Sequence, residues 1–71
     1  MLPSISHKRL IRILRKMGYI ITRQKGSHIR MRSEGKVSVT IPRHDAIAKG
    51  TLRKIMRDVN ISNIELEELL R

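Results

Sequence analysis

Three short runs of β-forming residues between residues 19 and 41 constrain the fold of this 71-residue chain more than any other feature. The runs read YIITRQ, HIRMR and VSVTI, and the glycine-containing segments Lys25-Gly26-Ser27 and Ser33-Glu34-Gly35 separate them. Short strands joined by such turns are typical of antiparallel hairpins. We therefore expect a three-stranded antiparallel meander.

The alternation of apolar and polar residues predicts how these strands pair. Three-residue loops at both turns pair Met31 with Val37 and Gln24 with His28, because this keeps apolar residues together. The expected core face holds Ile21, Ile29, Met31, Val37, Val39 and Ile41, with Tyr19 nearby. The opposite face is then polar and basic, and it holds Thr22, Gln24, His28, Arg30, Arg32, Lys36, Ser38 and Thr40.

Amphipathic helices are expected before and after the meander in the sequence. In the first, Ser6 is a suitable N-cap and Ile5 can pack on Leu10 as a hydrophobic staple. Its apolar stripe repeats with helical spacing, and Gly18 favours a left-handed end. The stripe consists of Leu10, Ile13, Leu14 and Met17.

The C-terminal third predicts two more helices. One should start near Gly50-Thr51, with Thr51 as its cap, and end near Asn60. Ser62 and Glu65 have the spacing of a capping box and open a short last helix. That helix is expected to bury Ile64 or Leu66 together with Leu69 and Leu70.

These elements predict an α+β fold in one domain, residues 1–71. The order is α-β-β-β-α with a short C-terminal helix, and each main element has one apolar face. A two-layer α/β sandwich buries these faces together and leaves the basic sheet face bare. This layout resembles that of double-stranded-RNA-binding domains.

The charge distribution points to an anionic partner. The formal net charge is +10, and residues 1–60 carry fifteen of the sixteen basic side chains but three of the six acidic ones. Such self-repulsion favours binding to a polyanion, although basic side chains can also serve solubility alone. With no cysteine, no apolar run of membrane-spanning length and no signal-peptide pattern, we expect a cytoplasmic protein.

Three separated motifs resemble the HicA (YcfA-like) family of small toxins from toxin–antitoxin pairs. They are G-Y-x-x-x-R-Q-x-G-S-H (Gly18 to His28), V-S-V-T-I-P-R-H (Val37 to His44) and K-G-T-L-R-K-I-M (Lys49 to Met56). The resemblance covers most of the chain. Many members have His-Pro just after the second strand, where this chain has Arg32-Ser33-Glu34. That departure bears on the hairpin tip and on RNA preference.

The resemblance implies a double-stranded-RNA-binding-like fold that acts as an mRNA interferase and inhibits translation and growth. The family's essential histidine falls on His28. The resemblance further implies a cognate HicB-like antitoxin that binds the toxin and blocks it. Either free edge of the meander can pair with a second chain, so monomer and homodimer both stay open.

The residues themselves fit RNA cleavage at His28. Histidine serves as general acid or base near neutral pH, and basic side chains stabilise phosphate charge. The expected RNA contacts are Gln24, Lys25, Ser27, Arg30, Arg32 and Lys36. We expect no metal and no cofactor, because acidic residues are scarce.

Two matters stay open at this level. The proton-transfer partner of His28 is Ser27, His44 or solvent. The alternative function is a non-catalytic nucleic-acid-binding module that uses the same face. Tyr19 is the one aromatic residue, so we expect recognition to depend on backbone charge and shape more than on base stacking.

Overall fold

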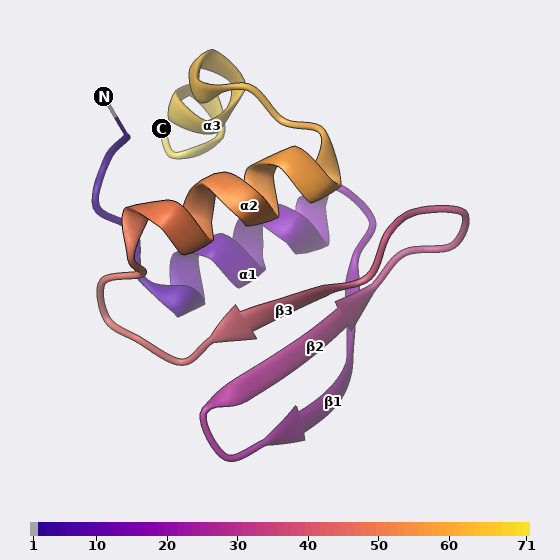
Figure 1. Ribbon diagram of the computed structural model, residues 1–71. Coiled ribbons are helices and arrows are strands. Elements are labelled where there is room, and N and C mark those ends of the chain that lie inside the picture. Colours follow the sequence, from indigo (N-terminus) through magenta and orange to yellow (C-terminus); the bar gives the residue numbers. More distant parts are fainter. Residues whose placement is uncertain (1) are drawn as a thin grey trace.

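The computed structural model describes residues 2–71, and its elements follow the expected order (Figure 1). They are α1 (His7–Lys16), β1 (Ile20–Lys25), β2 (His28–Arg32), β3 (Val39–Pro42), α2 (Lys49–Val59) and α3 (Asn63–Leu69). The strands form one antiparallel sheet in the order β1-β2-β3. The predicted α+β class, element order and three-stranded meander are confirmed.

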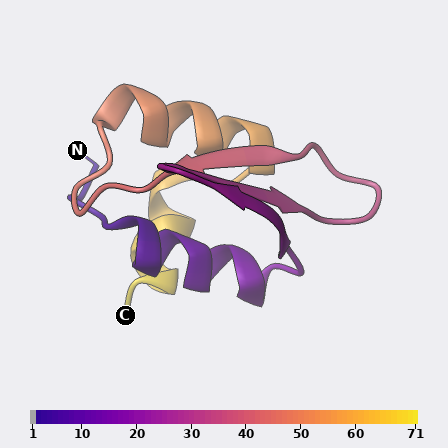
Figure 2. The same cartoon turned by 90° about the horizontal axis from the view of Figure 1, so that it is seen from below.

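The core lies where α1 and α2 meet the inner face of β2 and β3. The inner-face residues are fully buried, and they are Ile29, Met31, Val39 and Ile41. Both helices contact β3, whereas β1 is the strand farthest from them (Figure 1). Figure 2, a view from below, draws α2 above and α1 below the strands in projection, while the residues on one face of β2 and β3 alone are buried. The helices thus leave β1 and the outer sheet face uncovered.

Most helix ends agree with the sequence. The Ser6 side chain accepts a hydrogen bond from the Arg9 backbone N–H, and Asn60 ends α2 in the left-handed conformation. Ser62 and Glu65 form the complete capping box of α3. Leu66 is the residue that α3 buries fully. Side-chain and backbone capping bonds therefore account for these boundaries.

The second main helix starts one residue before the expected Gly50-Thr51, and Thr51 as its cap is wrong. The helix begins at Lys49 with Ala48 at its N-cap and no side-chain capping bond, so Thr51 lies inside the first turn. Tertiary bonds to the N-terminal segment explain the earlier start. The Ile47 N–H donates to the Ile5 carbonyl at 2.9 Å, and Lys49 Nζ donates to the Leu2 carbonyl at 2.8 Å.

The expected β2–β3 register is also wrong, by two residues. Met31 pairs with Val39, not with Val37, and the connecting loop spans residues 33–38. Within it, the Lys36 N–H donates to the Ser33 carbonyl and Gly35 has a φ of +75°. Val37 is consequently 58% exposed rather than in the core. Because the register shifts by an even number of residues, all the remaining β2 and β3 side chains stay on their predicted faces.

The β1–β2 hairpin combines a correct pair with an unexpected irregularity. Ile21 pairs with Met31 as predicted, but a β-bulge follows at Thr22. Beyond the bulge, Gln24 pairs with Ile29 and Lys25 with His28, so the loop has two residues instead of three. Gly26 has a φ of +57° at the first loop position, where a two-residue hairpin turn favours glycine.

Candidate functional site: the open sheet face

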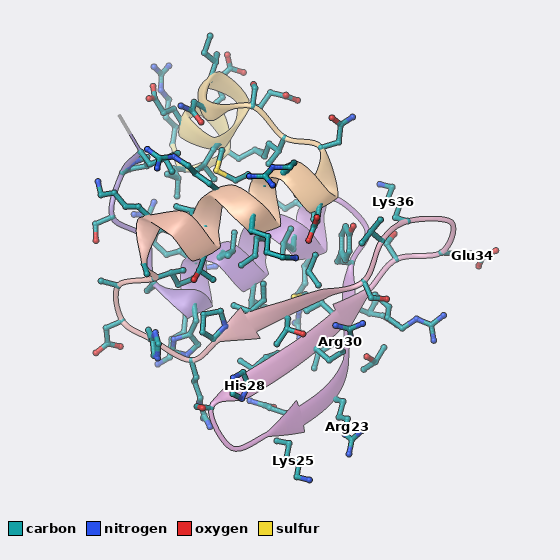
Figure 3. All side chains as sticks on the ribbon, in the orientation of Figure 1. Arg23, Lys25, His28, Arg30, Glu34 and Lys36 are labelled. Carbon is teal, nitrogen blue, oxygen red and sulfur yellow. The ribbon has the colours of Figure 1, made fainter. Side chains whose placement is uncertain are left out.

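The outer face of β2 carries a row of exposed basic side chains. His28, Arg30 and Arg32 alternate with the buried Ile29 and Met31. Successive side chains of a strand point to opposite sides, so the three basic residues share the uncovered face. Figure 3 shows His28 and Arg30 along β2 on this side of the sheet. The alternation in the sequence predicted this row correctly.

The bulge decides which β1 residues join that row. Side chains of directly paired residues lie on the same face, so Arg23 lies with Arg30 and Lys25 lies with His28. Gln24 pairs with the buried Ile29 and takes the opposite face. The predicted pairing of Gln24 with His28 is therefore wrong. We call the outer surface formed by Arg23, Lys25, His28, Arg30, Arg32 and Thr40 the open sheet face.

Arg23 is a residue that the sequence analysis missed. An unbroken strand places it on the core side, because it is one residue removed from both Thr22 and Gln24. A bulge adds one residue to one strand and reverses the face of every residue beyond it. A charged side chain at a predicted core position was the signal that this register needed an irregularity.

His28 lies at the closed end of the β1–β2 hairpin. Lys25 faces it from β1 and Pro42 faces it from β3. The Arg43 backbone N–H donates to the Ser27 carbonyl at 2.8 Å, which fastens the end of β3 to the hairpin turn. The exposed Arg43, which the sequence analysis did not assign, therefore lies at the same end of the sheet as His28.

Arg30 occupies the middle of the open sheet face. Its guanidinium donates to Thr40 Oγ1 at 2.8 Å, a contact across the β2–β3 pair. A guanidinium has five N–H donors, so this bond leaves others for a ligand. Arg30 is thus held in place and still able to bind an anion.

Lys36 does not join the site around His28. It lies in the β2–β3 loop, at the opposite end of β2 from His28 (Figure 3). Its Nζ lies 5.9 Å from the centroid of the Tyr19 ring and donates to the Met17 carbonyl at 3.4 Å. The position predicted for Lys36 beside the other basic residues is therefore wrong, because the loop is longer than expected.

Tyr19 packs against the same loop between β2 and β3. The ring is buried, and its hydroxyl donates to the Val37 carbonyl at 2.9 Å. Burial raises the pKa of Tyr19 above its ordinary value of 10.0, and the Asp58 carboxylate raises it further. The neutral phenol is thus the form that the fold prefers.

The other two histidines lie outside the strands, at the start of α1 and in the loop before α2. His7 is buried at the start of α1, and its backbone N–H and ring Nδ1 both donate to the His44 carbonyl at 2.9 Å. The side chain of His44 is exposed and does not cap α2. Within residues 2–71, no three His, Asp or Glu side chains come together as a metal site would require. His7 thus has a structural role in joining α1 to the loop before α2.

Comparison with known families identifies the chain. Residues 7–61 match the family model described as the HicA toxin of bacterial toxin–antitoxin systems. The match spans α1 through the end of α2 and includes the entire sheet. The chain belongs to the HicA toxin family. A search of curated proteins found no match.

Membership in the HicA family gives the chain its general role. It is the toxin component of a toxin–antitoxin pair, and its partner is an antitoxin. The match includes His28 and the rest of the open sheet face. None of the helices in residues 2–71 is long and apolar enough to cross a bilayer.

Proposed function

We propose that this toxin is a metal-independent endoribonuclease that cleaves mRNA, with His28 as general acid/base. The observation that carries the proposal is the placement of an exposed histidine among cations on a sheet face that no helix covers. A flat, basic and open surface accepts a long polyanion more readily than a small metabolite.

The chemistry follows from RNA itself, which carries its own nucleophile in the 2′-OH. His28 in its neutral form takes the 2′-OH proton, and the 2′-oxygen attacks the adjacent phosphorus. The P–O5′ bond then breaks, and the 5′-oxygen leaves with a proton supplied from solvent. The products are a 2′,3′-cyclic phosphate and a 5′-hydroxyl end. Water can open the cyclic phosphate in a second step.

Cations around His28 supply the electrostatic part of the reaction. Lys25 and Arg30 flank His28 on the open sheet face, one across the hairpin and one two residues along β2. Positive groups so placed stabilise the extra negative charge of the phosphorane. Arg23, Ser27 and Arg32 extend the surface over which the RNA backbone binds. Gln24 and Lys36, which lie off this face, are not part of the proposed contact.

The antitoxin is proposed to act by covering this same face. A HicB-like partner with an acidic surface would neutralise the cations and exclude RNA from His28. This blockade fits a cytoplasmic toxin that is kept inactive in a hetero-oligomer. The toxin released from that complex is the species that binds mRNA.

The end chemistry of the products tests this function. Purified protein is incubated with a defined RNA in excess EDTA, and the new ends are typed. We expect cleavage that yields 2′,3′-cyclic phosphate and 5′-hydroxyl ends, and no cleavage at a linkage whose 2′-OH is replaced by 2′-methoxy. Products with 5′-phosphate ends contradict the mechanism. Binding without cleavage assigns instead a non-catalytic RNA-binding module.

A further inference from the structure

A groove of about 210 Å³ runs between the open sheet face and α2. Arg30 and Thr40 form its sheet wall. Its helix wall is formed by Thr51, Lys54 and Asp58, none of which was assigned a binding role from the sequence. Because Arg30 belongs to both surfaces, the groove is continuous with the proposed RNA-binding face.

Helix geometry explains why these three residues line one wall. Thr51, Lys54 and Asp58 are separated by three and four positions, which places them on one side of α2. The buried Ile55 and Val39 supply the apolar floor between the two walls. The groove therefore combines an apolar floor with polar walls, as binding sites for small flat groups commonly do.

Asp58 gives the groove a chemical character that the rest of the open sheet face lacks. Its side chain is 27% exposed, and Oδ2 accepts from Lys54 Nζ at 2.9 Å. The hydrogen bonds described for residues 2–71 leave Oδ1 without a donor. Lys54 is 72% exposed at the rim. One wall thus carries an exposed cation and a partly buried carboxylate that has one oxygen without a protein donor.

A carboxylate repels phosphate but accepts hydrogen bonds from exocyclic amino groups of bases. Cytosine carries such a group at position 4, where uracil has a carbonyl oxygen that repels the carboxylate. Arg30 and Lys54 stand at the two sides of the groove, where they can hold the phosphates that flank a bound base. Arg30 is two residues from His28, about 7 Å along the strand, which is near the spacing of adjacent nucleotides.

We propose that the groove between α2 and the open sheet face binds one nucleotide of the RNA, and that Asp58 selects a base with an exocyclic amino group over uracil. This rests on the proposed function, because it adds a specificity subsite to the same RNA-binding surface. Asp58 acts as a specificity residue, and Lys54 contributes to backbone binding. Cytosine against uracil is the simplest contrast, since both rings have the same size.

A surface ion pair at positions i and i+4 is common and needs no ligand. The two readings differ in what each variant does. If Asp58 only partners Lys54, then neither Asp58→Asn nor Lys54→Ala changes the relative affinity for RNAs of different base composition. If Asp58 reads the base, only Asp58→Asn changes the preference between bases. Lys54→Ala then weakens binding to all RNAs alike.

The test is equilibrium binding of the full chain to oligocytidylate and oligouridylate of equal length at one salt concentration. It is carried out with the 2′-methoxy forms, so that cleavage does not interfere. We expect about tenfold tighter binding of the cytidine oligomer, the size of one good side-chain–base contact. Asp58→Asn should reduce the difference to within about twofold, and Lys54→Ala should preserve it.

Asp45→Asn is the matched control, because Asp45 is an exposed acid in the loop before α2 and lies outside the groove. It should leave the preference unchanged. Equal binding of the two oligomers by the unmodified protein overturns the subsite, as does a preference that survives Asp58→Asn in a variant shown to be folded by circular dichroism. RNA cleavage measured on the same protein reports on the proposed function separately: a protein that cleaves RNA without discriminating cytidine from uridine loses only the subsite.

Discussion

Lys25 and His28 face each other in the final residue pair of the β1–β2 hairpin. A straight β1 with a three-residue loop would place Gln24 in that position instead. The bulge at Thr22 and the two-residue loop therefore put a cation, not an amide, beside the histidine. This matters because a cation attracts the phosphate that His28 is proposed to act upon, whereas an amide offers a hydrogen bond without net charge.

Arg23 and Gln24 test the bulge directly, since they are neighbours on opposite faces. Arg23→Ala should weaken RNA binding several-fold, because it removes a cation from the open sheet face. Gln24→Ala should leave binding within about twofold. Fluorescence anisotropy with a labelled RNA measures both. If Gln24→Ala is the more damaging change, the strand pairing described here is wrong in solution.

Arg30 is expected to contact phosphate, and salt dependence isolates that contact. The slope of the logarithm of affinity against the logarithm of salt concentration should fall by about one unit in Arg30→Ala. Arg53→Ala is the control, because Arg53 is exposed on the side of α2 that faces away from the groove. An equal loss of slope in both variants would mean that long-range charge, not a local contact, governs binding.

His7 should contribute to stability and not to RNA cleavage. His7→Ala removes the buried ring bond to the His44 carbonyl, so the free energy of unfolding should fall by about 1–2 kcal/mol. Cleavage per folded molecule should not change. His44→Ala, at an exposed side chain, should alter stability by less than about 0.5 kcal/mol. Urea unfolding monitored by circular dichroism provides the comparison. A His7→Ala variant that is fully stable yet inactive would overturn this division of roles.

Tyr19 predicts a loss of stability at alkaline pH. Burial raises the pKa of the folded phenol above its ordinary value of 10.0. The stabilisation that the neutral phenol provides is therefore complete below pH 10 and is lost as the pH rises through the folded pKa. Tyr19→Phe removes the hydroxyl bond to the Val37 carbonyl and should cost about 1 kcal/mol at neutral pH. The difference between the two proteins should shrink as the pH rises beyond 10. A constant difference across that range would show that the hydroxyl does not titrate differently in the folded state.

Local patterns in the sequence predict much of this fold. Helical spacing and capping residues set α1 and α3, because Ser6 and Ser62 each accept a backbone N–H of the first turn. Glycines with positive φ mark both hairpin turns. The alternation in β2 alone puts His28 and Arg30 outside and Ile29 and Met31 inside. These features depend on neighbours in the chain, so a single sequence contains them.

The features that were not predicted depend on contacts between distant segments. The β2–β3 loop is longer than expected, and the Tyr19 hydroxyl bonds a carbonyl within it, that of Val37, eighteen residues away in the sequence. The early start of α2 goes with the bonds of Ile47 and Lys49 to the N-terminal segment. The groove with Asp58 requires α2 to lie along the β3 edge, which helical periodicity cannot specify. The α2 side chains of the groove could therefore be placed near the open sheet face only from the tertiary structure.

RNA cleavage by His28→Ala, measured against the unmodified protein, tests the central claim most directly. The assay is gel resolution of a labelled RNA in excess EDTA, with both proteins at equal folded concentration. His28 is exposed, so the variant should keep its stability within about 0.5 kcal/mol. We expect it to bind RNA with nearly unchanged affinity and to cleave it at least a hundredfold more slowly, the usual contribution of a general acid/base. Cleavage by His28→Ala at the rate of the unmodified protein would contradict the assignment of His28 as the catalytic group.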